Sequence, residues 1–300
     1  MSTAGTDITG GTASAPSFGA ALAEAMDAHG PLCVGIDPHR ALLDAWGLPD
    51  SPRGLRDFAL RAVDAVGGGV AAVKPQSAFF ERHGAAGIAV LEETLAALRA
   101  CGTLSILDVK RGDIGSTMGG YAQAYLADGA PLAADAITVS PYLGYGSLTP
   151  ALDLARSTGR GVFVLALTSN PEGASVQHAR TGQGRTRSVA ADVVAGAARS
   201  NASARAAGRL GGVGLVVGAT TGGAVAELGI DLLGANAPLL APGVGAQGAG
   251  AAELESVFGA ARRHVLASTS RGVLAAGPDP AALRAAALTA AAQASAALRG

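Results

Sequence analysis

The stretch Leu104-Ser-Ile-Leu-Asp-Val-Lys-Arg-Gly-Asp-Ile-Gly-Ser-Thr-Met118 is the most informative part of this chain. Its first four residues form a short apolar run, which predicts a buried strand, and an amphipathic stretch follows from Tyr121. Asp108 and Lys110 are two residues apart, so their side chains point the same way on an extended strand end. Asp113 follows a glycine, where the chain can turn sharply. Alternating charges where a strand becomes a loop indicate either a surface salt-bridge cluster or a catalytic site.

Similar apolar runs recur along the chain and alternate with segments of helical period. The eight runs lie near residues 32–37, 70–74, 103–108, 134–140, 161–168, 213–219, 238–243 and 264–269. The expected helices include Leu55–Val66, Ala85–Ala100, Ser188–Ala207, Ala251–Ala261 and, as the last, Ala281–Leu298. Strand–helix alternation implies right-handed crossovers and a parallel sheet. Eight units without a break in composition favour a closed barrel over an open sheet.

We therefore expect an α/β fold of the (β/α)8 or TIM-barrel type, with parallel strands and the active site at their carboxyl ends. Residues 1–16, rich in Ser, Thr, Gly and Ala, read as a disordered tail, and residues 17–300 as a single barrel domain. The polar residues support this arrangement. Each of six lies at or just after the carboxyl end of a different apolar run: Asp37, Lys74, Asp108, Ser140, Ser169 and Arg271. In such a barrel these ends converge on one face.

Composition narrows the classes of function. The net charge of −1 gives no basic surface for nucleic acid, so an anionic ligand must be held locally. Two cysteines cannot form a disulfide scaffold, and we expect Cys33 and Cys101 to be free thiols. We also expect no signal peptide, no membrane-spanning run and a cytoplasmic location. The five histidines show no metal-ligand spacing, so no metal is expected.

The opening stretch closely resembles the D-x-K-x-x-D-I-x-x-T signature of the orotidine 5'-phosphate decarboxylase family. Further motifs occur in that family's order: Gly35-Ile-Asp-Pro38, Val73-Lys-Pro75, Leu167-Thr-Ser-Asn-Pro171, Pro242-Gly-Val-Gly-Ala-Gln-Gly248 and Ser270-Arg-Gly272. Together they span residues 35 to 272. The segment Lys74-Pro-Gln-Ser-Ala-Phe-Phe-Glu81 and the chain length are similar to the longer bacterial branch, type 2.

The resemblance implies a carboxy-lyase that converts orotidine 5'-monophosphate to UMP and CO2 in de novo pyrimidine biosynthesis, without a cofactor. Lys110 would donate the proton to C6 of the pyrimidine. Asp108 would lie near the substrate carboxylate, and Lys74 and Asp113 would complete an alternating charge network. In the family the second aspartate of the motif reaches the neighbouring subunit's site. The resemblance therefore implies a homodimer with shared active sites, to which Asp113, Ile114 and Thr117 contribute.

Substrate-binding residues follow from the same resemblance. Asp37 would accept a hydrogen bond from the ribose, and Gln247 and Arg271 would hold the phosphate. Ser169 would contact the pyrimidine edge, with Thr168 and Ser140 as alternatives. The segment Ser169–Arg187 is the longest irregular stretch, and we interpret it as a mobile flap over the pyrimidine rather than an inert insertion.

Two other functions compete with this one. A magnesium-dependent keto-sugar-phosphate decarboxylase or hexulose-phosphate synthase shares a similar strand end but binds a metal through carboxylates that this chain does not show. A non-catalytic barrel that merely binds pyrimidine nucleotides would typically have lost a charge of the network. Lys74 and the segment Arg111-Gly-Asp-Ile-Gly-Ser-Thr117 favour the orotidylate enzyme.

Overall fold

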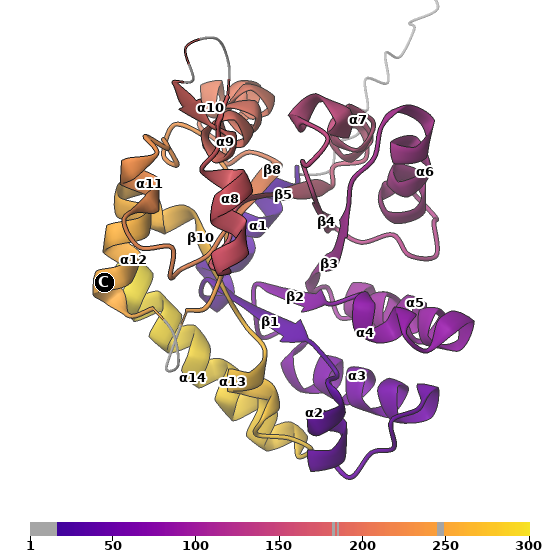
Figure 1. The fold of residues 1–300 in the computed structure, drawn as a ribbon. Helices are drawn as coiled ribbons and strands as arrows, with labels where there is room; N and C mark the ends of the chain where they lie inside the picture. The colour runs from indigo at the N-terminus through magenta and orange to yellow at the C-terminus, as the bar shows by residue number, and fades with distance from the viewer. Residues whose placement is uncertain (1–16, 182–183, 185, 245–248) are drawn as a thin grey trace, which may run out of the picture.

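A computed structural model describes residues 17–181, 184, 186–244 and 249–300. Eight parallel strands form a closed barrel in the order β1-β10-β9-β8-β5-β4-β3-β2, which confirms the expected (β/α)8 architecture (Figure 1). The strands are β1 Leu32–Ile36, β2 Ala72–Pro75, β3 Leu104–Arg111, β4 Ala136–Val139, β5 Gly161–Leu167, β8 Val213–Val217, β9 Leu239–Pro242 and β10 Val265–Thr269. Each expected apolar run therefore overlaps one strand, although β2 and β3 extend beyond the predicted ends at residues 74 and 108.

Helices surround the barrel between successive strands (Figure 1). Those that follow β1 to β4 are α2 Arg40–Ala45, α3 Pro52–Val66, α4 Ala78–Glu81, α5 Gly84–Ala100, α6 Gly115–Leu126 and α7 Thr149–Ser157, with the 3-10 turn η1 Tyr145–Leu148 before α7. Those that follow β5 to β10 are α8 Ala174–Gln177, α9 Val189–Ser200, α10 Ala202–Ala206, α11 Ala224–Glu227, α12 Ala251–Phe258, η3 Gly259–His264, α13 Arg271–Leu274 and α14 Pro280–Arg299.

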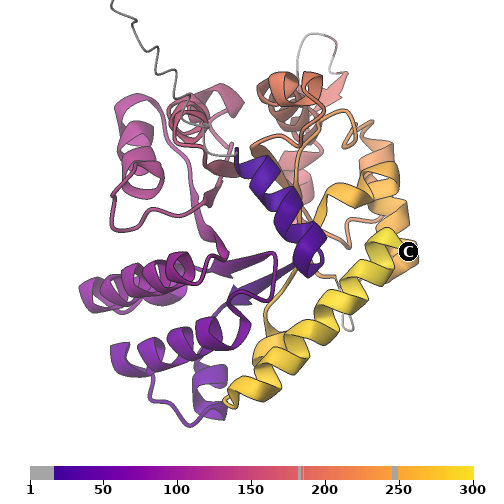
Figure 2. The same ribbon diagram turned by 180° about the vertical axis from the view of Figure 1, so that it is seen from behind.

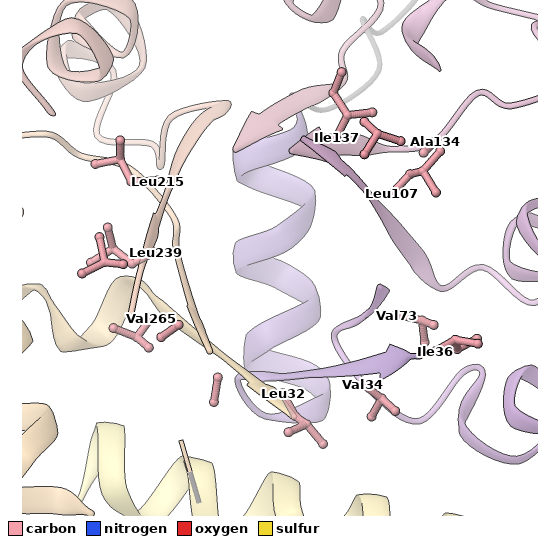
Figure 3. Close-up of a cluster of buried hydrophobic side chains, with 14 of the residues drawn as sticks. Leu32, Val34, Ile36, Val73, Leu107, Ala134, Ile137, Leu215, Leu239 and Val265 are labelled. Atoms are coloured by element: carbon pink, nitrogen blue, oxygen red, sulfur yellow. The ribbon is translucent and has the colours of Figure 1, made fainter. Parts of the chain in front are cut away.

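The strands are buried on both faces, because alternate side chains enter two separate cores. On β1, Leu32, Val34 and Ile36 belong to the core between the strands and the helices (Figure 3). The intervening Cys33 belongs to the core inside the barrel. This explains why the apolar runs in the sequence are continuous rather than alternating.

An additional helix, α1 Phe18–His29, closes the end of the barrel opposite the carboxyl ends of the strands (Figure 2). Its buried residues Phe18, Leu22 and Met26 enter the inner core, and the rings of Phe18 and Phe163 meet edge to face at 5.8 Å. Side chains of α1 therefore fill this end of the barrel, and the charged residues gather at the opposite end.

The structure corrects three boundaries. The predicted helix Ser188–Ala207 is two helices, α9 and α10, which are interrupted at Asn201. The side-chain amide of Asn201 donates hydrogen bonds to the Val213 and Ala235 carbonyls and so fixes the interruption. The predicted helix Ala251–Ala261 ends at Phe258 and continues as the 3-10 turn η3. The expected irregular segment Ser169–Arg187 contains the 3-10 turn η2 Pro171–Gly173, helix α8 Ala174–Gln177 and the paired strands β6 Arg180–Thr181 and β7 Arg187–Ser188.

Helix α14 is the one helix in the described part of the chain that is long and apolar enough to cross a membrane by length and composition. This differs from the sequence expectation that no such run exists. A core helix passes the same test, and one face of α14 packs on the barrel through Leu283, Ala287 and Leu298. The apolar composition of α14 comes mainly from alanine, and it is weak evidence that the helix spans a membrane.

Candidate active site

A carboxylate between two ammonium groups forms the centre of the barrel mouth. Asp108 on β3 accepts hydrogen bonds from Lys74 Nζ at 2.8 Å and from Lys110 Nζ at 2.6 Å, one at each carboxylate oxygen. Thr138 on β4 donates its hydroxyl to the same oxygen as Lys110, at 2.8 Å. Two neighbouring strands, β2 and β3, thus bring the three charges together, and β4 adds the hydroxyl of Thr138. The positions at the strand ends predicted this convergence.

The end of β3 is bent at the residue that carries the exposed ammonium. Lys110 has φ 45°, a left-handed conformation that costs a non-glycine residue free energy unless the surroundings hold it. The pairing of β3 with β4 shifts register between Leu107 and Arg111. The Lys110 amide donates to Thr138 Oγ1 at 3.0 Å, which holds the bend in place. The predicted strand ended at 108, so this bend was not foreseen.

Burial separates the roles of the two lysines. The side chain of Lys74 is 9% exposed and that of Lys110 is 46% exposed, so Lys110 is the more exposed of the two lysines that border the cavity. Burial lowers the pKa of Lys74, but the carboxylates of Asp108 and Asp37 outweigh it and raise this pKa overall. The network therefore keeps a permanent positive charge behind Asp108.

Asp108 remains ionised despite its burial. Burial raises the pKa of its carboxyl, but the ammonium groups of Lys74 and Lys110 more than offset this effect and hold the pKa at about 2. The usual value is 3.8. A fixed negative charge between two fixed positive charges is a preorganised electrostatic arrangement of the kind that stabilises charge developing in a transition state.

The network faces a large cavity at the carboxyl ends of the strands. The cavity continues from this face to helix α14, where Ala290 and Gln293 border it, and its total volume is about 1220 Å³. The network residues border it together with Asp37, Gln76, Ser270 and Arg271. Two buried oxygens among these residues, Asp37 Oδ1 and Ser270 Oγ, have no hydrogen-bond partner within the described part of the chain. Unpaired buried polar atoms at a cavity wall are typical of positions that a polar ligand completes.

Some predicted site residues do not border this cavity. Asp113 follows β3, and its carboxylate accepts a hydrogen bond from the next backbone amide, of Ile114, at 2.8 Å. Ile114, Thr117 and Ser169 are exposed outside the cavity lining. Gln247 lies outside the described residues. The structure thus brings together five of the predicted residues: Lys74, Asp108, Lys110, Asp37 and Arg271.

Sequence reasoning did not identify Thr138 or Ser270 as individual contributors. Thr138 is 1% exposed and lies in the apolar run of β4, so a single polar residue in that run was the available signal. Its contacts with both Asp108 and the Lys110 amide make it part of the site. Within the described ranges, no group of three or more His, Cys, Asp or Glu residues is arranged to hold a metal ion. Both Cys33 and Cys101 are free thiols, as expected.

A closed (β/α)8 barrel with an alternating charge network in its mouth defines the class: a barrel protein with an active-site-like pocket for an anionic ligand. The family model described as "Orotidine 5'-phosphate decarboxylase / HUMPS family" matches residues 30–286. The chain belongs to this family, in agreement with the resemblance seen in its motifs.

Individual relatives agree with the family. The chain is 60% identical to an orotidine 5'-phosphate decarboxylase of Salinispora arenicola over 284 residues, which cover 95% of this chain and 99% of the relative. It is 58% identical to the Streptomyces coelicolor protein of the same name, over 90% of this chain and 94% of the relative. A crystal structure from Streptomyces avermitilis, described as a proposed orotidine 5'-phosphate decarboxylase, has a TM-score of 0.90 at 56% identity and covers 96% and 98% of the two chains.

Proposed function

We propose that this protein is an orotidine 5'-phosphate decarboxylase that converts orotidine 5'-monophosphate to UMP and CO2 in de novo pyrimidine biosynthesis. The observation that carries the proposal is the Lys74–Asp108–Lys110 network at the wall of the barrel cavity. Relatives at 50–60% identity that bear this name support it.

The reaction explains why an ammonium is needed at this point. When the bond between C6 and the carboxylate breaks, the electron pair stays on C6 in the plane of the ring, where no conjugated group can accept it. A positive charge held beside C6 stabilises this pair, and the same group can then supply a proton. We assign this role to Lys110, whose Nζ proton forms the new C6–H bond of UMP. Solvent returns a proton to the amine afterwards.

Asp108 contributes in two ways. It orients Lys110 through the 2.6 Å hydrogen bond. Its charge also repels the substrate carboxylate: two like charges about 4 Å apart repel by roughly 4 kcal/mol at an effective dielectric constant near 20. Part of that repulsion is relieved as CO2 leaves. The buried Lys74 keeps Asp108 ionised, so the repulsion does not disappear by protonation.

The rest of the cavity fits a nucleotide. We assign Asp37, with its unpaired Oδ1, to a ribose hydroxyl, which can donate to it. We assign Arg271 to the phosphate, since a guanidinium binds phosphate in a bidentate manner. Gln247 remains a proposed phosphate ligand. Ser169, with Thr168 and Ser140 as alternatives, remains the proposed contact to the pyrimidine edge.

We further propose a homodimer in which Asp113, Ile114 and Thr117 complete the partner's site. Asp113 follows the strand that carries Lys110 but does not border the same chain's cavity. Large apolar side chains are exposed on the loops after β3 and β4: Ile114 is 62% exposed, Tyr142 80% and Leu143 52%. Such exposure close to a site is typical of a protein–protein interface. In an isologous dimer, each chain would cover the other's loops.

Subunit mixing tests the shared site. If Lys110 and Asp113 serve different sites of the dimer, Lys110→Ala and Asp113→Ala homodimers each have two damaged sites. In a mixed dimer one site carries both substitutions and the other carries neither. Random exchange gives about half mixed dimers, so roughly a quarter of all sites regain the wild-type set. Activity should then rise well above that of either parent. No recovery after verified subunit exchange would refute the cross-subunit role of Asp113.

An ultraviolet absorbance assay tests the activity itself. The purified protein should consume orotidine 5'-monophosphate and release one UMP per substrate. A protein that binds the nucleotide but leaves it intact would be the non-catalytic binder. We also propose that no cofactor is required, that residues 17–300 form one domain and that the protein works in the cytoplasm.

A further inference from the structure

A second polar cluster lies directly behind the charge network, on the outer side of β3. Its members are Ser77, Glu81, Arg111, Tyr121 and Tyr125. None of these residues borders the cavity, and the proposed reaction assigns none of them to the substrate. Arg111 is the residue after Lys110, and Glu81 ends the sequence segment that begins at Lys74. The proposed reaction uses the lysines and leaves this cluster without a role.

The guanidinium of Arg111 is held between two helices. One of its terminal nitrogens donates to Glu81 Oε1 on α4 at 2.6 Å and reaches the hydroxyl of Tyr125 on α6 at 3.4 Å. The same guanidinium lies 5.6 Å from the centre of the Tyr121 ring, within the range of a cation–π contact. A planar group with this many contacts has little freedom to move.

Glu81 is in turn tied to the backbone of the strand that carries the site. Ser77 donates its hydroxyl to Glu81 Oε1 at 2.6 Å, and its backbone amide donates to the Asp108 carbonyl at 3.2 Å. Ser77 is 2% exposed, whereas the side chain of Glu81 is 36% exposed, so the path leads from the buried strand to the surface. A continuous path therefore runs from the backbone of Asp108 through Ser77 and Glu81 to the side chain of Arg111.

This path spans the bend at Lys110. Residues 108 and 111 lie on either side of the left-handed residue, and the path joins them to one another from behind the strand. The carbonyl of Arg111 also accepts the Ser140 amide at 2.8 Å, which fixes the far side of the bend to β4. A strained backbone conformation persists only where its surroundings hold it. The Arg111 cluster supplies that support from the side opposite the substrate.

We propose that Arg111, held by Glu81 and Ser77, is a positioning residue that fixes the bent end of β3 and so places the Lys110 ammonium against the substrate carbon. This inference rests on the proposed decarboxylation. It concerns residues that act through Lys110 rather than on the substrate. Displacement of a catalytic group by a fraction of an ångström reduces the rate much more than it reduces ground-state binding.

Steady-state kinetics of Arg111→Met with orotidine 5'-monophosphate, together with UMP binding by calorimetry, test the inference. We expect kcat to fall at least tenfold while the Kd for UMP stays within threefold of wild type. Arg111→Lys, which keeps a cation near Glu81, should recover part of the lost kcat. Glu81→Gln should lower kcat in the same way, and the double variant should be little worse than Arg111→Met, because both substitutions break one path.

Arg56→Met is the matched control, because Arg56 forms a comparable ion pair with Glu93 between α3 and α5 and does not border the cavity. Its kcat should be unchanged. A kcat of Arg111→Met within threefold of wild type would overturn the inference, as would parallel loss of kcat, UMP binding and thermal stability. Wild-type protein that binds UMP but does not decarboxylate would instead refute the proposed function, and the inference would fall with it.

Discussion

Replacement of Asp108 by Asn removes the charge that pairs two ammonium groups while it keeps the shape of the side chain. The structure sets the size of the effect. Lowering the pKa of this carboxyl from 3.8 to about 2 on folding corresponds to about 2 kcal/mol of stability. Because Lys74 is 7% exposed, its buried ammonium loses a partner as well, and we expect a loss of about 2–4 kcal/mol at pH 7.

The sign of the pH dependence follows from the direction of the shift. A carboxyl whose pKa is lower in the folded state contributes its full stability above the unfolded pKa. That contribution is lost as the pH falls from about 4 through about 2. About half of it remains near pH 3. The difference in stability between wild type and Asp108→Asn should therefore narrow progressively as the solution is acidified.

Urea denaturation followed by the fluorescence of Trp46 measures this difference directly. Trp46 is 5% exposed and donates to the Leu274 carbonyl, so unfolding changes its surroundings. Asp153→Asn, in an exposed pair with Arg156, serves as the control and should change stability little at any pH. An Asp108→Asn variant as stable as wild type at pH 7 would refute this reasoning. So would a stability difference that stays constant between pH 7 and pH 3.

Three further predictions concern activity. Arg271→Ala should lower kcat/KM about a hundredfold, roughly 2.7 kcal/mol, because remote phosphate binding helps to position the reacting carbon; an unchanged kcat/KM in steady-state assays would place the phosphate elsewhere. Activity should survive exhaustive EDTA treatment. If EDTA inactivated the protein and Mg²⁺ restored its activity, the protein would instead be a magnesium-dependent enzyme of the keto-sugar-phosphate decarboxylase or hexulose-phosphate synthase type. Thr138→Val should lower kcat by up to about 30-fold, because it removes hydrogen bonds to Asp108 and to the Lys110 amide worth about 1 kcal/mol each; a kcat equal to that of wild type would show that these bonds do not position Lys110.

The barrel was predictable because its signals are local. Each strand is buried on both faces, so continuous apolar runs mark all eight, and polar residues at their ends mark the open face. The Asp108–Lys110 contact was predictable for the same reason: two residues two positions apart on a strand share a side.

Other features depend on contacts that are distant in the sequence. Helix α1 closes one end of the barrel through the contact of Phe18 with Phe163, and no local sequence pattern predicts this contact. The left-handed Lys110 is held by Thr138 from the next strand, so its own sequence neighbours predict a plain strand end. The break at Asn201 likewise depends on carbonyls of residues 213 and 235. Asp113, Ile114 and Thr117 are expected to act in the partner subunit's site, so the cavity of a single chain does not show their role.

The most direct test of the central assignment is the activity of Lys110→Ala. Lys110 is half exposed at the cavity, so its removal should leave the fold and UMP binding largely intact. Its ammonium matters most when negative charge appears on C6, and most of kcat should therefore disappear. We predict a kcat below a tenth of the wild-type value with the Kd for UMP little changed. A variant that kept more than about a tenth of kcat, a loss of less than ~1.4 kcal/mol, would contradict the assignment of Lys110 as the proton donor.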